Sequence, residues 1–146
     1  MPVLADVERL AASDHHLAVL AVEQPDGDVH ASVVSAGVIA DPVDGSAGVA
    51  AVVGGSTRKL GLLRRSGRAT LVFKHGWEWV AVSGPVRLVG PRDSTDLGLD
   101  VPETIRSVFR AAGGTYEDWN EFDRVMAEDR RCAVFVRAAT ITSNPV

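Results

Sequence analysis

The middle of the chain reads GSAGVAAVVGGSTRKLGLLRRSGRATLVFKHGW (residues 45–77), and this stretch contains no aspartate or glutamate. It does contain six cationic residues: Arg58, Lys59, Arg64, Arg65, Arg68 and Lys74. The whole chain has 146 residues and a formal net charge of −4. A group of cations without an acidic neighbour, inside an acidic protein, favours a binding site for an anion.

A helix start is predicted within this stretch. Gly54-Gly55 ends an apolar strand pattern, and the glycines would let a ligand approach the backbone closely. Ser56 or Thr57 can cap a helix that runs to about Arg65, and Ser66-Gly67 is typical of a helix end.

Arg58 and Lys59 fall in the first turn of this predicted helix. The helix dipole disfavours cations there by roughly 0.3–1 kcal/mol each. With the free backbone N–H groups of the turn, the two side chains would form a site for a phosphate. Arg64 and Arg65 are better interpreted as charges on a solvated helix surface. The Gly-Lys-Ser/Thr order of an ATP-binding loop is missing, so ATP hydrolysis is not implied.

Hydrophobic periodicity divides the rest of the chain. Apolar, β-branched runs predict strands at 16–22, 29–40, 47–53, 68–74, 77–89 and 131–139. Helical spacing of apolar residues predicts helices at 3–11, 101–112 and 119–126. Strands joined by short turns favour an antiparallel sheet curled into a small barrel with helices on its ends. Without a repeat or linker, we expect one mainly β domain over residues 1–146.

Two tryptophans stand out in the strand predicted at 77–89. Trp77 and Trp79 share one face, and such a flat apolar wall suits a planar cofactor or a subunit interface. Ordinary core packing is the alternative, and it is the favoured interpretation for Trp119. Gly84-Pro85 predicts a bulge or kink in the same strand.

Composition excludes several classes of function. The acidic balance disfavours general nucleic-acid binding, and no apolar run is long enough to cross a membrane. Cys132 is the single cysteine, and the four histidines show no metal-ligand spacing, so we expect no metal. The first ten residues have no basic, apolar signal region, so a cytoplasmic location is expected. No motif identifies a catalytic nucleophile, so a bound cofactor would carry any chemistry.

Three segments resemble one family. Residues 57–72 resemble the segment that follows the third strand in pyridoxamine 5′-phosphate oxidase-like split-barrel proteins, and residues 76–84 resemble the strand after it. Residues 109–131 are similar to an actinobacterial branch that includes deazaflavin-dependent (coenzyme F420) oxidoreductases. The similarity covers residues 16–136, and the order and spacing of the segments carry it.

The resemblance implies a Greek-key split β-barrel of the FMN-binding-protein type. It also implies a homodimer with two cofactor sites at the interface. Lys59 matches the phosphate-binding lysine of the family, and Arg58 lies beside it, next to Thr57 and Ser56.

Two further segments acquire expected roles from the same resemblance. Ser32, Val33 and Val34 match the strand that runs under the cofactor's ring system. Trp77 and Trp79 match positions that approach the cofactor from the other subunit.

The function that this implies is hydride transfer between coenzyme F420 and a small organic substrate. FMN is the alternative cofactor, because both carry a phosphate on a ribityl chain; the acid-free stretch suits the polyglutamate tail of the deazaflavin. Pyridoxamine phosphate oxidation itself is not expected, because the C-terminus lacks recognisable basic residues for that substrate. A non-catalytic cofactor or haem carrier, with His30 or His75 as axial ligand, and a structural dimer with an empty groove remain as alternatives.

Overall fold

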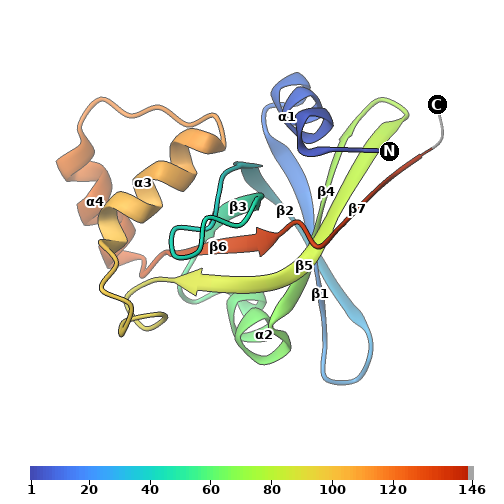
Figure 1. The fold of residues 1–146 in the computed structure, drawn as a ribbon. Coiled ribbons are helices and arrows are strands. Elements are labelled where there is room, and N and C mark those ends of the chain that lie inside the picture. Colours follow the sequence, from blue (N-terminus) through green and yellow to red (C-terminus); the bar gives the residue numbers. More distant parts are fainter. Residues whose placement is uncertain (145–146) are drawn as a thin grey trace.

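The structure of the protein is a computed structural model that describes residues 1–144, and it shows a closed antiparallel β-barrel with four helices (Figure 1). The strands are β1 (Leu17–Glu23), β2 (Val29–Val38), β3 (Gly48–Val53), β4 (Arg68–His75), β5 (Glu78–Val89), β6 (Cys132–Arg137) and β7 (Thr140–Ser143). The helices are α1 (Leu4–Ser13), α2 (Arg58–Ser66), α3 (Val101–Ala111) and α4 (Trp119–Glu128). The barrel closes in the order β1-β2-β3-β6-β5-β4, which confirms the predicted mainly β barrel with flanking helices.

The last strand differs from its prediction. The sequence predicts one strand over 131–139, whereas β6 ends at Arg137 and β7 begins at Thr140, and both pair with β5. Gly84 explains the break, because a Cβ there would lie 2.0 Å from the carbonyl oxygen of Arg137. The chain therefore crosses β5 closely at a glycine. Gly84-Pro85, where the sequence predicts a kink, is also where β5 changes its partner from β4 to β6.

β3 and β6 are buried on both faces. Their inward side chains join the barrel core with apolar residues of α1 and α2, including Val7, Leu10, Leu60 and Leu63. Their outward side chains, such as Ala50 and Phe135, pack under α3 and α4 in a second core cluster. This explains why both strands read as continuous apolar runs rather than as alternating ones.

On the other strands, helices reach the outer face only near the ends: α3 packs on Gly37 of β2, where a Cβ would lie 1.9 Å from the Ala111 carbonyl oxygen, and Val89 of β5 joins the second core cluster. Val33 of β2 pairs with Val19 of β1, Val19 with Val72 of β4, and Val72 with Ala81 of β5. Their neighbours along each strand point into the barrel, so these four side chains form one row on the outside. Val33 is 64% exposed. We call these four residues the outer valine row.

Candidate functional site

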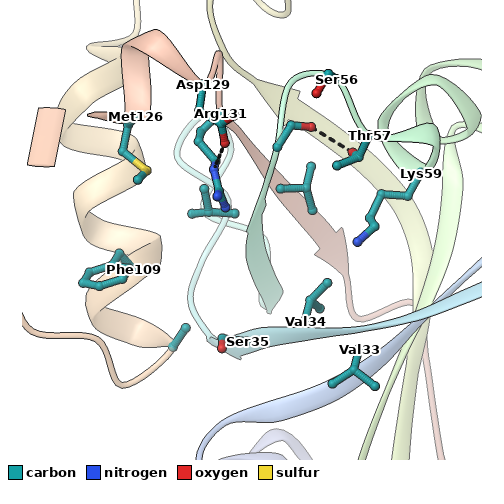
Figure 2. A pocket seen from close by; sticks show the side chains of 14 residues that line it. Val33, Val34, Ser35, Ser56, Thr57, Lys59, Phe109, Met126, Asp129 and Arg131 are labelled. Atoms are coloured by element: carbon teal, nitrogen blue, oxygen red, sulfur yellow. Dashed lines mark hydrogen bonds and ion pairs between the residues drawn. The ribbon is translucent and has the colours of Figure 1, made fainter. Parts of the chain in front are cut away.

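A cavity of about 520 Å³ lies where β2, β3, the start of α2 and the α3–α4 pair meet (Figure 2). This volume is in the range of pockets that hold a drug-sized ligand or a cofactor. One part of its wall is polar and comes from the loop between β3 and α2. The other part is mostly apolar and comes from the strands and from the two helices; Ser35 and the pair Asp129 and Arg131 are its polar members.

The polar wall consists of Ser56, Thr57 and Lys59. Thr57 is the N-cap residue, but its hydroxyl donates to the carbonyl oxygen of Gly54 at 2.8 Å and caps no N–H group. The prediction of a Ser56 or Thr57 side-chain cap is therefore wrong in this respect: Thr57 has the right place, and its hydroxyl turns back to the loop. The first turn of α2 keeps its backbone donors, and it contains no acidic residue.

Lys59 points into the cavity from this first turn (Figure 2). Within residues 1–144 its ammonium group makes no ion pair and no side-chain hydrogen bond. A free ammonium group, the nearby Ser56 hydroxyl and an uncapped helix N-terminus form a donor set that suits a phosphate. This part of the cavity therefore fits the phosphate of a cofactor.

The apolar wall comes from two sides of the cavity. Val33, Val34 and Val52 contribute from β2 and β3, and Phe109 and Met126 contribute from α3 and α4. Figure 2 shows Phe109 and Met126 on the helices opposite Lys59. Apolar side chains on both sides suit the faces of a planar ring.

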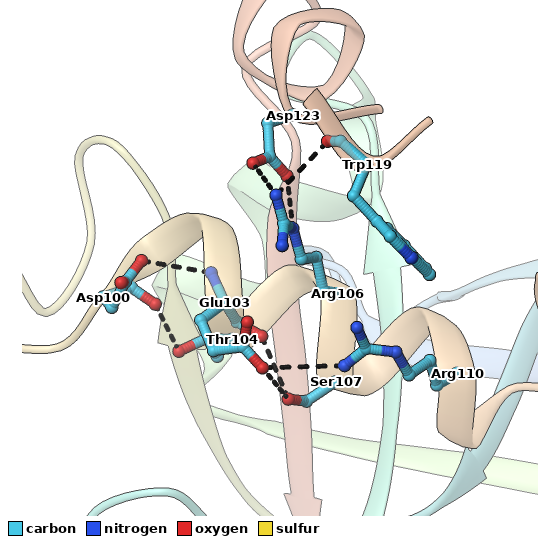
Figure 3. Close-up of polar contacts among 8 residues, drawn as sticks. All are labelled: Asp100, Glu103, Thr104, Arg106, Ser107, Arg110, Trp119 and Asp123. Carbon is cyan, nitrogen blue, oxygen red and sulfur yellow. Dashed lines mark hydrogen bonds and ion pairs between the residues drawn. The ribbon is translucent and has the colours of Figure 1, made fainter. Parts of the chain in front are cut away.

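The α3–α4 pair that carries this wall is held by polar contacts (Figure 3). Arg106 binds Asp123 through Nε at 2.9 Å and through a terminal nitrogen at 2.5 Å. The guanidinium carbon of Arg110 lies 4.6 Å from the centre of the Trp119 ring, which packs partly buried against the second core cluster. Trp119 therefore has a packing role, as predicted, and it does not line the cavity.

The double glycine has a different role from the predicted one. A Cβ on Gly55 would lie 2.3 Å from the carbonyl oxygen of Arg130, and the Gly55 N–H donates to the carbonyl of Asp129 at 3.0 Å. Gly55 is thus required for packing on the turn after α4, rather than for the approach of a ligand. Gly54 does line the cavity.

That turn contributes a cation that sequence reasoning missed. Arg131 lines the cavity, and the carboxylate of Asp129 accepts a hydrogen bond from its Nε. The N–H of Arg131 donates to Met126 at 2.9 Å and that of Arg130 to Ala127 at 3.1 Å. These two bonds form a Schellman-type helix end with Arg130 at φ 51°. Nothing local in the sequence indicates that this turn faces the start of α2.

Five of the nine predicted cofactor-binding residues line this cavity: Val33, Val34, Ser56, Thr57 and Lys59. Arg58 does not, since its guanidinium donates to Gln24 at 2.8 Å. Ser32 does not either: its Oγ is buried and has no hydrogen-bond partner among residues 1–144.

The two predicted tryptophans lie apart from the cavity of their own chain. Trp77 occupies the turn between β4 and β5 and is 95% exposed, while Trp79 begins the outer face of β5. Asn144 ties both backbones, accepting from the Trp79 N–H at 3.1 Å and donating to the Trp77 carbonyl at 2.9 Å. The predicted contact of Trp77 and Trp79 is with a cofactor bound to a second subunit, and it stays a prediction.

Among residues 1–144, no helix has both the length and the apolar character needed to span a membrane.

No protein-family model matches the chain. Solved structures with the same fold have been found for proteins with different ligands. A pyridoxamine 5′-phosphate oxidase-related, FMN-binding protein from Nostoc punctiforme is 11% identical, with a TM-score of 0.62 over 95% of this chain and 82% of the other.

An F420 reductase is 13% identical, with a TM-score of 0.60 over 92% of this chain and 94% of the other. The heme storage protein HutZ from Vibrio cholerae is 11% identical, with a TM-score of 0.57 over 97% and 94%. At these identities the likeness concerns the fold. The chain therefore has the barrel fold of the pyridoxamine 5′-phosphate oxidase-like FMN-binding proteins, a fold on which proteins named for different ligands are built.

Proposed function

We propose that the cavity binds a phosphate-bearing deazaflavin, coenzyme F420, and that the protein is an oxidoreductase acting on a small organic substrate. FMN is the alternative cofactor at the same site. The observation that carries the proposal is the uncapped N-terminus of α2 with Lys59, which lies in a cavity whose remaining wall is largely apolar.

A phosphate resolves an unfavourable arrangement in the first turn. Two cations there, without an acid, oppose the helix dipole by roughly 0.3–1 kcal/mol each. An anion bound to Lys59 and the free N–H groups would reverse this balance, with about 1.5–3 kcal/mol for each hydrogen bond to a charged group. The overall charge of the acid-free stretch 45–77 favours the deazaflavin over FMN, because its polyglutamate tail adds further negative charge, although Lys59 is the one cation of this stretch that lines the cavity.

The chemistry would come from the cofactor, which accepts or donates a hydride when bound. The residues of this chain would hold the phosphate, fix the ring between apolar walls and exclude water from it. Among residues 1–144, the one carboxylate that lines the cavity belongs to Asp129, which is paired with Arg131, and we assign no catalytic acid or base.

A homodimer is part of the proposal. The outer valine row (Val33, Val19, Val72 and Ala81) has no helix over it, and Val33 belongs both to this row and to the cavity wall. A second copy packed on this face would bring a subunit boundary to the cofactor, and it would give the 95% exposed Trp77 a surface to contact. We expect a dimeric mass at micromolar concentration, and a monomeric mass after Val72→Glu; a monomeric parent protein would refute the interface site.

The test is a titration of the purified protein with coenzyme F420 and with FMN, followed by tryptophan fluorescence. Tighter binding of F420 supports the proposal, and tighter binding of FMN moves the protein to the alternative. Lys59→Ala should weaken binding well beyond Arg65→Ala, an exposed cation of the same helix that does not line the cavity.

The non-catalytic alternatives predict other results. A haem carrier would give a Soret band that disappears on replacement of His30 or His75. A cofactor carrier would bind F420 or FMN and show no turnover with any electron acceptor. Binding of no cofactor would refute the proposal and leave a structural dimer.

A further inference from the structure

We propose that Arg131 is a specificity-determining residue that recognises the ring of the cofactor, while Lys59 binds its phosphate. The terminal nitrogens of Arg131 would donate to the carbonyl-rich edge of a planar heteroaromatic ring. This inference rests on the proposed function and adds to it a second, chemically distinct contact in the same cavity.

Arg131 is paired through one nitrogen of its guanidinium group. Asp129 accepts a hydrogen bond from Nε of Arg131, and within residues 1–144 the terminal nitrogens of that guanidinium have no hydrogen-bond partner. Arg64 and Arg106 differ, because each binds its carboxylate through Nε and a terminal nitrogen together. Asp129 thus holds the guanidinium at Nε and leaves its two terminal nitrogens, the planar fork of donors, free to bind a ligand.

The backbone of Arg131 is held in a fixed position. Arg131 follows a Schellman-type turn in which Arg130 has a positive φ, and the Arg130 carbonyl packs against Gly55. A non-glycine residue in this conformation persists where the surrounding contacts hold it. Figure 2 shows Arg131 between the polar wall with Lys59 and the apolar wall with Met126. A donor fork next to an apolar surface suits the polar edge of a ring whose faces are apolar.

The charge around Arg131 favours the cofactor ring over a second anion as its partner. Asp129 neutralises Arg131, so that the pair has no net charge, whereas Lys59 has no counter-charge within residues 1–144. An unneutralised ammonium group suits a phosphate. A neutralised, planar fork suits neutral carbonyl acceptors that lie in one plane. For this reason we assign Arg131 to the ring and not to the phosphate or to an acidic tail.

The experiment compares two ligands that differ in the phosphate, FMN and riboflavin, by equilibrium titration of the whole protein. Arg131→Ala should weaken the binding of both by the same factor, about tenfold for the loss of two hydrogen bonds to neutral acceptors. Lys59→Ala should weaken FMN and leave riboflavin unchanged. If the protein prefers F420, the same comparison uses F420 and its chromophore without phosphate and tail.

Two further variants test whether the planar guanidinium group of Arg131 is required, or only its charge, and whether the effect is specific to the cavity. Arg131→Lys keeps the charge but loses the planar fork, and it should not restore binding. Arg124→Ala is the control, because Arg124 lies on α4, pairs with Glu128 and does not line the cavity. The Tm of each variant verifies the fold.

The inference is overturned if Arg131→Ala weakens FMN but not riboflavin, which would make Arg131 a phosphate contact. It is also overturned if Arg131→Ala matches Arg124→Ala, or if Arg131→Lys binds as the parent does. Failure of the parent protein to bind any flavin or deazaflavin refutes the proposed function itself and is seen before any variant is made.

Discussion

Helix α2 carries cations at both ends, and the two ends differ in what neutralises them. At the C-terminal end, Arg64 binds Asp93 through two hydrogen bonds of 3.0 and 2.7 Å, and a cation there also interacts favourably with the helix dipole. At the N-terminal end, Lys59 has no such partner within residues 1–144 and opposes the dipole. The fold accounts for the cation at one end, and the proposed cofactor phosphate would account for the cation at the other.

The largest effect on stability is expected at the loop before the N-terminal end. Gly55→Ala places a Cβ against the Arg130 carbonyl, so the loop or the turn after α4 must move, at a cost of about 1–3 kcal/mol. Gly61, within α2, has open space around its Cβ position, and Gly61→Ala should stabilise by up to about 1 kcal/mol. Urea unfolding of both variants measures the difference. Equal, small effects would mean that the contact between the loop and the turn is unimportant.

A smaller effect is expected at the C-terminal end. Arg64→Ala removes a bidentate pair and leaves the mostly buried Asp93 without its cationic partner, while the arginine is 38% exposed. After allowance for screening by solvent, we expect a loss of about 1 kcal/mol in the free energy of unfolding. Cofactor affinity should stay the same, which is the reverse of the pattern for Lys59→Ala. A loss of affinity in Arg64→Ala would remove the distinction between the two ends.

Smaller still is the effect of Lys59 on the ligand-free protein. Lys59→Glu places an acid in the first turn, where the dipole favours it, and should raise the free energy of unfolding by about 0.3–1 kcal/mol. The same change should abolish binding of a phosphate-bearing cofactor. Thermal unfolding without ligand, paired with a titration, measures both. A variant that is less stable and still binds would contradict the account.

The last prediction concerns the Cys132 thiol and the pH dependence of stability in the alkaline range. Burial, and then the nearby Asp93, raise the pKa of the Cys132 thiol to about 12. The unfolded thiol has a pKa near ~8.5, so the folded state binds more protons between these values and its stability falls as the pH rises through that window. We expect Cys132→Ala to reduce this fall above about pH 9 and to leave the profile below pH 8 unchanged in shape. An unchanged alkaline slope would show that the thiol is not protected.

Much of the fold follows from the sequence, because the barrel strands have clear apolar periodicity and the turns have clear glycine signals. Gly67 illustrates this, with φ 69° at the predicted end of α2. The sequence does not reveal β7, because the break at Gly84 comes from contact between two strands. Local patterns indicate where an element ends, but not which distant segment packs against it.

The sequence predicts only part of the site, because local patterns do not indicate contacts between distant segments. Lys59 and Thr57 lie in a local pattern that positions them at a helix start. Arg131 reaches the cavity because Gly55 brings a distant turn to this helix start, and no local pattern indicates that contact. Arg58 is next to Lys59 in sequence, but successive residues of a helix point in different directions, and Arg58 reaches Gln24 instead.

An NMR titration that follows the backbone amides of Arg58, Lys59 and Leu60 tests directly whether the start of α2 holds the phosphate of the cofactor. With FMN, or with F420 if it binds more tightly, we predict that these amides shift strongly. With riboflavin, or with the phosphate-free deazaflavin chromophore, they should shift little, while amides of the apolar wall such as Val34 and Val52 respond to both ligands. Equal responses of the α2 amides to ligands with and without phosphate would contradict the claim that this helix start holds the phosphate.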